Sequence, residues 1–99
     1  MAKPKSLDKD QVLKAIRDAL GPQGRIFPSR HITRDSMPKR NFDMTDVLNV
    51  LSKATTVKPM WNTKTETWNY DIPGRDLDGN ELTIRIVPTE DGIVLVTGF

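Results

Sequence analysis

The apolar residues in the first half of the chain recur at helical spacing. Between Lys9 and Leu20 they form a single stripe that consists of Val12, Ala15, Ile16, Ala19 and Leu20. Such a stripe predicts an amphipathic helix whose apolar face packs on a core. Asp8 and Gln11 have the spacing of a capping box at its start, and Pro22 prevents its continuation. Residues 21–30 are then expected to form a loop.

Two further helices are predicted before the middle of the chain. A short one runs from about Arg30 to Met37, with Ser29 as its N-cap and Pro38 as its stop, because the residue before a proline avoids helical geometry. A longer one runs from about Met44 to Ala54 and begins after Asp43 as N-cap. Its apolar face consists of Met44, Val47, Leu48 and Leu51.

In the second half the pattern changes to the alternation that is typical of strands. Residues 67–72 and 82–87 alternate apolar and polar side chains, which predicts two half-buried strands. The unbroken apolar run Ile93–Val96 predicts a central strand that is buried on both faces. Residues 56–61 are expected to form an edge strand, because Pro59 has no N–H to donate to a second neighbour.

This order of elements predicts one α+β domain over residues 1–99, with N-terminal helices packed on one face of a three- or four-stranded antiparallel sheet. Residues 1–6 are expected to be a disordered tail. The composition, with 36% apolar and 28% charged residues, is globular. The chain has no cysteine, and it has no apolar run near the roughly 18 residues that span a bilayer. We therefore expect a cytoplasmic protein without disulfides, and no membrane partner.

The charges are distributed unevenly along the chain. Residues 1–42 carry a net charge of +6 and residues 43–99 a net charge of −4. Five cations crowd into 16 residues with one acidic residue among them, and these cations are Arg25, Arg30, Arg34, Lys39 and Arg40. Such clustering suits contacts to RNA phosphates. The alternative is a solvated polar segment beside acidic hairpin turns.

His31 is the only histidine, and without cysteine it cannot form a zinc site. It can act as a general acid or base near neutral pH, and Arg34 lies on the same helical face three residues later. An imidazole beside a guanidinium is suited to metal-free RNA cleavage, since the cation stabilises the charged transition state. The alternative is a surface histidine in a basic helix.

Arg85 interrupts the most regular strand and points to the face opposite Leu82, Ile84 and Ile86. With Thr83 it could contact a phosphate from an exposed sheet face, and the alternative is a cross-strand ion pair.

Three aromatic side chains, Trp61, Trp68 and Tyr70, could stack on bases. Core packing is the alternative for Trp68 and Tyr70, which share the parity of Ile72.

The turn Asp76–Glu81 resembles part of a calcium loop. With Gly79 as the sixth position of such a loop, Gly74 and Arg85 would occupy the first and twelfth, where carboxylates are required. A hairpin turn is therefore the better interpretation, and we expect no metal and no cofactor.

Several segments in order resemble a known family. Met-Pro-Lys-Arg-Asn-Phe at residues 37–42 precedes Asp46-Val47 and Val50-Leu51, and Trp68-Asn69-Tyr70 leads to Asp76-Leu77-Asp78-Gly79 and the final strand at 93–97. Over residues 30–99 this looks like the domain-of-unknown-function family numbered 4258, of bacteria and phages. That family is distantly similar to the barnase–RelE-like small ribonuclease toxins.

The resemblance implies a sheet face that carries a metal-independent ribonuclease site. Its candidate catalytic residues are His31, Arg34, Arg85 and Thr97. Together with the clustering of cations, it makes Arg30, Arg34, Lys39, Arg40 and Arg85 the candidate nucleic-acid-binding residues. The family pattern has histidine and arginine at the positions of Ile32 and Ser36. We therefore expect an RNA-cleaving or RNA-binding toxin-like protein, with an antitoxin-like or other protein as a further possible partner. The alternative is a non-catalytic module that binds protein or nucleic acid and has a degenerate site.

Overall fold

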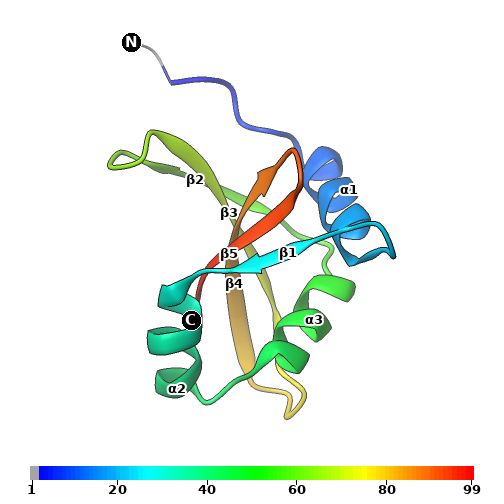
Figure 1. The fold of residues 1–99 in the computed structure, drawn as a ribbon, viewed down its shortest axis with the longest axis vertical. Coiled ribbons are helices and arrows are strands. Elements are labelled where there is room, and N and C mark those ends of the chain that lie inside the picture. Colours follow the sequence, from blue (N-terminus) through cyan, green and yellow to red (C-terminus); the bar gives the residue numbers. More distant parts are fainter. Residues whose placement is uncertain (1–2) are drawn as a thin grey trace.

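The computed structural model describes residues 3–99 as an α+β fold, with helices packed against a five-stranded sheet (Figure 1). The elements in chain order are α1 (Lys9–Leu20), β1 (Ile26–Pro28), the π-helix η1 (Ile32–Ser36), α2 (Met37–Arg40), α3 (Met44–Ser52), β2 (Lys58–Asn62), β3 (Thr67–Arg75), β4 (Glu81–Thr89) and β5 (Gly92–Gly98). The strands lie in the order β1-β5-β4-β3-β2. The predicted fold class is confirmed.

Local side-chain bonds start α1 and α3 where the sequence predicts. Asp8 accepts a hydrogen bond from the Gln11 N–H at 2.8 Å, and the Gln11 side chain accepts one from the Asp8 N–H at 2.9 Å. Asp43 and Asp46 form the equivalent capping box on α3. These bonds satisfy N–H groups that have no partner within the helix.

The middle helix differs from its prediction at its C-terminal end. Ser29 caps its start, since its Oγ accepts from the Ile32 N–H at 3.2 Å. The helix does not stop before Pro38 but continues through α2 to Asn41, which has the left-handed φ of 55°. A wider π-helical turn precedes the proline, with the Met37 N–H bonded to the Ile32 carbonyl. Pro38, which has no N–H to donate, directly follows this wider turn and lies within the continuous helix.

The sheet has five strands rather than three or four, and it is mixed rather than wholly antiparallel. The additional strand β1 lies in the segment expected to be a loop, and it runs parallel to β5 with Ile26 opposite Ile93. The other neighbouring pairs are antiparallel. β2 lies at the opposite edge, as Pro59 predicts.

One face of the sheet supplies most of the core. Its buried side chains are Tyr70, Ile72, Leu82, Ile84, Ile86, Ile93 and Leu95. They pack against buried residues of the helices and the helix connection, which are Val12, Ile16, Ala19, Ile32, Phe42, Val47, Val50 and Leu51. Within β5, Val94 and Val96 are only half-buried, so the prediction of a strand buried on both faces holds only for the core face. The other face, which we call the open face, carries side chains that range from buried Asn69 and Asp71 to half-buried Arg85 and Val94.

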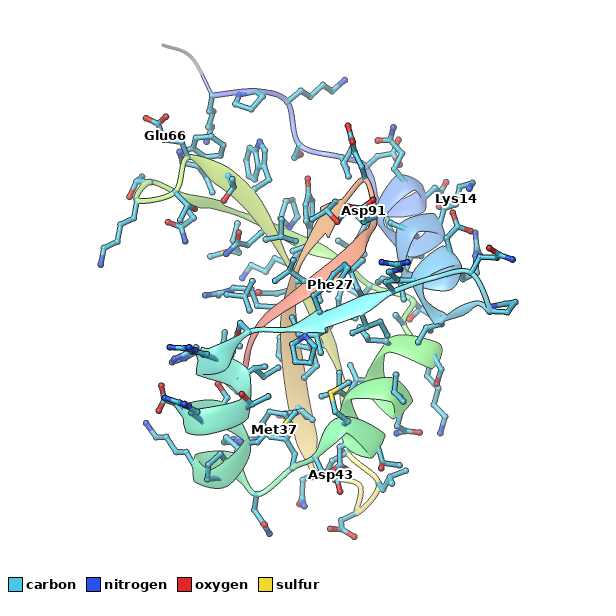
Figure 2. The ribbon with its side chains drawn as sticks, viewed as in Figure 1. Lys14, Phe27, Met37, Asp43, Glu66 and Asp91 are labelled. Carbon is cyan, nitrogen blue, oxygen red and sulfur yellow. The ribbon has the colours of Figure 1, made fainter. Side chains whose placement is uncertain are left out.

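The β2–β3 hairpin extends beyond the helices, and Figure 2 shows Glu66 at its far end. On this hairpin the Trp61 and Trp68 rings pack edge to face at 5.3 Å. The N-terminal segment crosses them, because the Trp68 Nε1–H donates to the Pro4 carbonyl and the Leu7 N–H donates to the Tyr70 hydroxyl. Trp68 and Tyr70 therefore pack rather than face a partner.

The predicted disordered tail covers residues 1–6. Residues 1 and 2 lie outside the described residues, and residues 3–6 have no regular secondary structure. Across residues 3–99, none of the helices has both the length and the apolar character needed to cross a membrane. The outer side of α1 is polar, and Figure 2 shows Lys14 on this side, away from the strands.

Candidate functional site

The open face of the sheet carries a row of polar side chains across three neighbouring strands. Asp71 on β3 lies opposite Arg85 on β4, and Arg85 lies opposite Thr97 on β5. The Arg85 Nε–H donates to Asp71 Oδ1 at 2.7 Å and an Nη2–H donates to Oδ2 at 3.1 Å. Arg85 also lies 5.2 Å from the ring centre of Phe99. Arg85 therefore forms the cross-strand ion pair that was the alternative to a phosphate contact.

This ion pair changes what Arg85 can do. Hydrogen bonding to the Asp71 carboxylate raises the pKa of the guanidinium above its usual value, so the side chain keeps its charge. A guanidinium has five N–H groups, and Asp71 uses two of them. Three N–H groups remain for a ligand, although Asp71 already offsets much of the positive charge.

The helix beside this row is joined to β5 by two side-chain bonds. The Ser36 and Thr97 hydroxyls are hydrogen-bonded at 2.8 Å, and Ser36 is 5% exposed. The Ser29 hydroxyl donates to the Val96 carbonyl at 2.9 Å. Both bonds fix η1 along the edge that β5 exposes beyond β1. The sheet register places Thr97 beside Arg85, and these two bonds hold the helix that carries His31 against the same strand.

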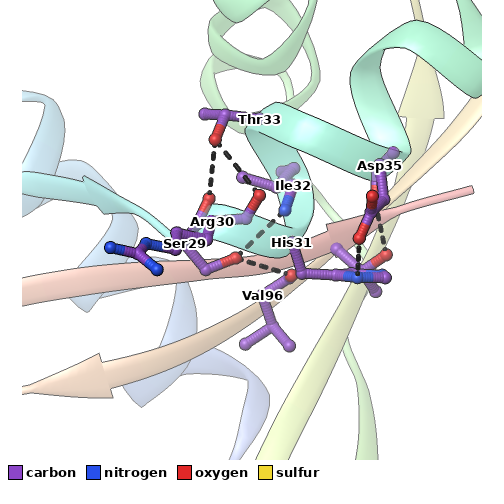
Figure 3. Close-up of polar contacts among 9 residues, drawn as sticks. Ser29, Arg30, His31, Ile32, Thr33, Asp35 and Val96 are labelled. Carbon is purple, nitrogen blue, oxygen red and sulfur yellow. Dashed lines mark hydrogen bonds and ion pairs between the residues drawn. The ribbon is translucent and has the colours of Figure 1, made fainter.

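His31 is exposed and its ring is oriented by a neighbour on the same helix. Its Nδ1 lies 3.1 Å from Asp35 Oδ2, one turn away, as Figure 3 shows. With the proton on Nδ1, the ring donates to Asp35 and leaves Nε2 able to accept a proton. Among residues 3–99, no hydrogen bond or ion pair joins His31 to Arg34, Arg85 or Thr97.

The cations of the basic segment have different surroundings in the structure. Arg30, Arg34 and Lys39 are exposed, and no ion pair within the described part of the chain neutralises them. Figure 3 shows the Arg30 side chain extending away from the hydrogen bonds at the helix start. Arg40 instead anchors the helix, because its Nη2 donates to the Glu81 carbonyl at 2.7 Å. Of the four predicted cations on the helix, three are thus free to bind an anion, and Arg25, which precedes β1, is exposed without an ion pair in residues 3–99 as well.

A hollow of about 360 Å³ lies on the open face beside Arg85, and sequence reasoning missed its most unusual residue. Asn69 lines this hollow and is only 4% exposed, yet its side chain has no hydrogen bond within residues 3–99. Met60 is its cross-strand partner and also lines the hollow. Three larger hollows, of about 510, 500 and 400 Å³, have no buried polar side chain in their walls. The available signal for Asn69 was its position two residues before Asp71 on an alternating strand.

The turn between β3 and β4 is a hairpin turn. Asp76 Oδ1 accepts from the N–H groups of Asp78 and Asn80 at 2.9 and 2.8 Å. Gly79 has a φ of 87°, which suits glycine. The carboxylate of Asp76 is therefore occupied by the turn itself. In residues 3–99, no three His, Asp or Glu side chains are placed to bind one metal ion.

The sequence matches no protein-family model, and no curated protein and no solved structure matches the chain. The resemblance to the small ribonuclease toxins therefore stays a prediction, and function has to be argued from the site alone.

Proposed function

We propose that the protein acts on RNA and binds a single strand along the helical segment 30–40. The observation that supports this most is the set of three exposed cations, Arg30, Arg34 and Lys39, none of them neutralised by an ion pair in the described residues. Cations of this kind bind phosphates and release counterions, which is the main source of affinity for nucleic acid.

The rigidity of the segment supports the same proposal. The bonds Ser36–Thr97 and Ser29–Val96 hold the helix on the sheet, and the bond from Arg40 to Glu81 holds its end. Cations on a fixed helix lose less conformational freedom on binding than cations on a flexible tail.

Metal-free RNA cleavage is a second candidate, and the His31–Asp35 contact favours it. A carboxylate that fixes one ring nitrogen leaves the other available to take the proton of a ribose 2′-hydroxyl. The Arg85 N–H groups that Asp71 does not use belong to the open sheet face, where the register places Thr97 opposite Arg85. Cleavage requires the RNA to reach both the helix and this face.

RNA binding is tested with a short fluorescein-labelled single-stranded RNA, whose anisotropy reports the dissociation constant. In the triple variant Arg30→Ala, Arg34→Ala and Lys39→Ala we expect roughly tenfold to hundredfold weaker binding, from the loss of about three phosphate contacts. The matched control removes three exposed cations elsewhere, in Lys9→Ala, Arg17→Ala and Lys53→Ala. Equal losses in both variants would indicate non-specific attraction and contradict the proposed surface.

Cleavage is tested by incubating the same RNA with the protein in EDTA and separating the products on a gel. We expect His31→Ala to abolish cleavage while Lys53→Ala retains it. If the wild type leaves the RNA intact, the protein binds RNA without cutting it. If it neither binds nor cuts RNA, the alternative of a protein-binding module is favoured.

A further inference from the structure

The hollow on the open sheet face contains a polar group that the fold leaves without a partner. The Asn69 side chain is more than nine-tenths buried and forms no hydrogen bond within the described residues. In the described residues, every side-chain nitrogen or oxygen that is fully buried has a hydrogen bond. Since the Asn69 amide has none, its nitrogen and oxygen must remain partly accessible. Since Asn69 lines the hollow, the hollow is the space that its amide faces. An amide that reaches the hollow has a donor and an acceptor available to a ligand, which makes this group a candidate for ligand binding.

The other walls of the hollow are chemically distinct. Met60, the cross-strand partner of Asn69, offers a flexible apolar side chain. Arg85 contributes the N–H groups that Asp71 does not use. Lys64 is exposed at the hairpin end of the hollow and is not ion-paired in the described residues. One end is therefore suited to a flat, partly apolar group and the rim to an anion.

We propose that this hollow binds one nucleobase of a single-stranded RNA, with an adjoining phosphate on Arg85 and Lys64. This inference rests on the proposed RNA binding and adds where a base is bound. An asparagine amide presents a donor beside an acceptor and pairs with a base edge that presents the complement. The volume of about 360 Å³ lies at the small end of ligand pockets and fits one nucleotide. Unstacked bases of single strands are the usual targets of such recognition.

The test uses nuclear magnetic resonance of the full chain labelled with ¹⁵N. AMP, GMP, CMP and UMP are titrated separately, and ribose 5-phosphate and inorganic phosphate serve as probes without a base. At least one nucleotide should shift the Asn69 side-chain NH₂ and the Arg85 Nε–H signals saturably. Asn69→Leu, which keeps the volume, should weaken that nucleotide about tenfold. Asn80→Leu, on an exposed turn, is the matched control and should bind as the wild type does.

Lys64→Ala provides a second variant at an exposed position, where folding is not at risk. It should weaken the binding of both the nucleotide and ribose 5-phosphate. The inference is overturned if no nucleotide shifts these signals, if Asn69→Leu binds as tightly as the wild type, or if phosphate alone reproduces the shifts with equal affinity.

Different results would contradict the base site in the hollow and the RNA-binding surface on the helix. If Asn69→Leu leaves RNA affinity and base preference unchanged, the helix surface stands and the base site is wrong. If nucleotides bind the hollow but the Arg30, Arg34 and Lys39 variant binds RNA normally, the helix surface is wrong and the base site stands.

Discussion

The ion pair between Asp71 and Arg85 gives the most quantitative prediction. Asp71→Ala removes both hydrogen bonds to the guanidinium. The Asp71 side chain is 10% exposed and that of Arg85 is 29% exposed, so the carboxylate is buried and the cation reaches water. Breaking a fully buried pair costs about 3–5 kcal/mol, whereas an exposed pair contributes less than about 1 kcal/mol. For this half-buried pair we expect a loss of about 2 kcal/mol in the free energy of unfolding.

The assay is urea unfolding followed by the fluorescence of Trp61 and Trp68, repeated by thermal unfolding. A loss of about 2 kcal/mol corresponds to a fall in Tm of roughly 8–16 °C for a domain of this size. Arg85→Leu and the double variant complete a cycle, which should give a coupling of roughly 1–2 kcal/mol. Freeing Arg85 should also tighten RNA binding by Asp71→Ala a few-fold. A coupling below about 0.5 kcal/mol, with unchanged RNA affinity, would refute the reasoning.

Substitutions at three further positions probe how α3 is capped and packed on the sheet. Gly74→Ala would place a Cβ 2.8 Å from the side chain of buried Val50, and it should destabilise by about 1–3 kcal/mol in urea; a neutral result would contradict this. Asp43→Ala removes the capping bond of α3 and should cost about 1 kcal/mol, while Asp43→Asn should retain most of that stability. Hydrogen bonds from the N–H groups of Leu77 and Asp43 lower the pKa of Asp46 in the folded protein. The ionised Asp46 carboxylate therefore stabilises the fold above about pH 4, and this contribution is lost as the pH falls through the pKa of Asp46 in the folded protein. The difference in the free energy of unfolding between the wild type and Asp46→Asn, measured in urea, should therefore become smaller below about pH 4. A stability difference between the two proteins that does not change with pH would contradict this prediction.

The elements that could be predicted from the sequence are those fixed by nearby residues. Asp8 and Gln11 start α1 through bonds over three residues, and this spacing is visible in the sequence. β1 could not be predicted, because three residues show no period and its backbone bonds come from β5, far along the chain. The continuation of the helix through Pro38 depends on a π-helical turn, which no residue pattern indicates.

The same distinction between nearby and distant residues decides which parts of the candidate site the sequence predicts. Alternation places Arg85 on the open face, and the sheet register places Thr97 beside it. The burial of Asn69 depends instead on how side chains from β2 and β4 close around it. The bond between Ser36 and Thr97 joins residues 61 apart and could not be anticipated from spacing.

The salt dependence of RNA binding tests the central claim most directly. The association constant for a short single-stranded RNA is measured over a series of salt concentrations. With about three phosphate contacts from Arg30, Arg34 and Lys39, the logarithm of that constant should fall with the logarithm of salt with a slope of roughly −2. In the variant that lacks all three cations, the slope should be less steep by about the same amount. A flat slope in the wild type, or an unchanged slope in the variant, would contradict the account.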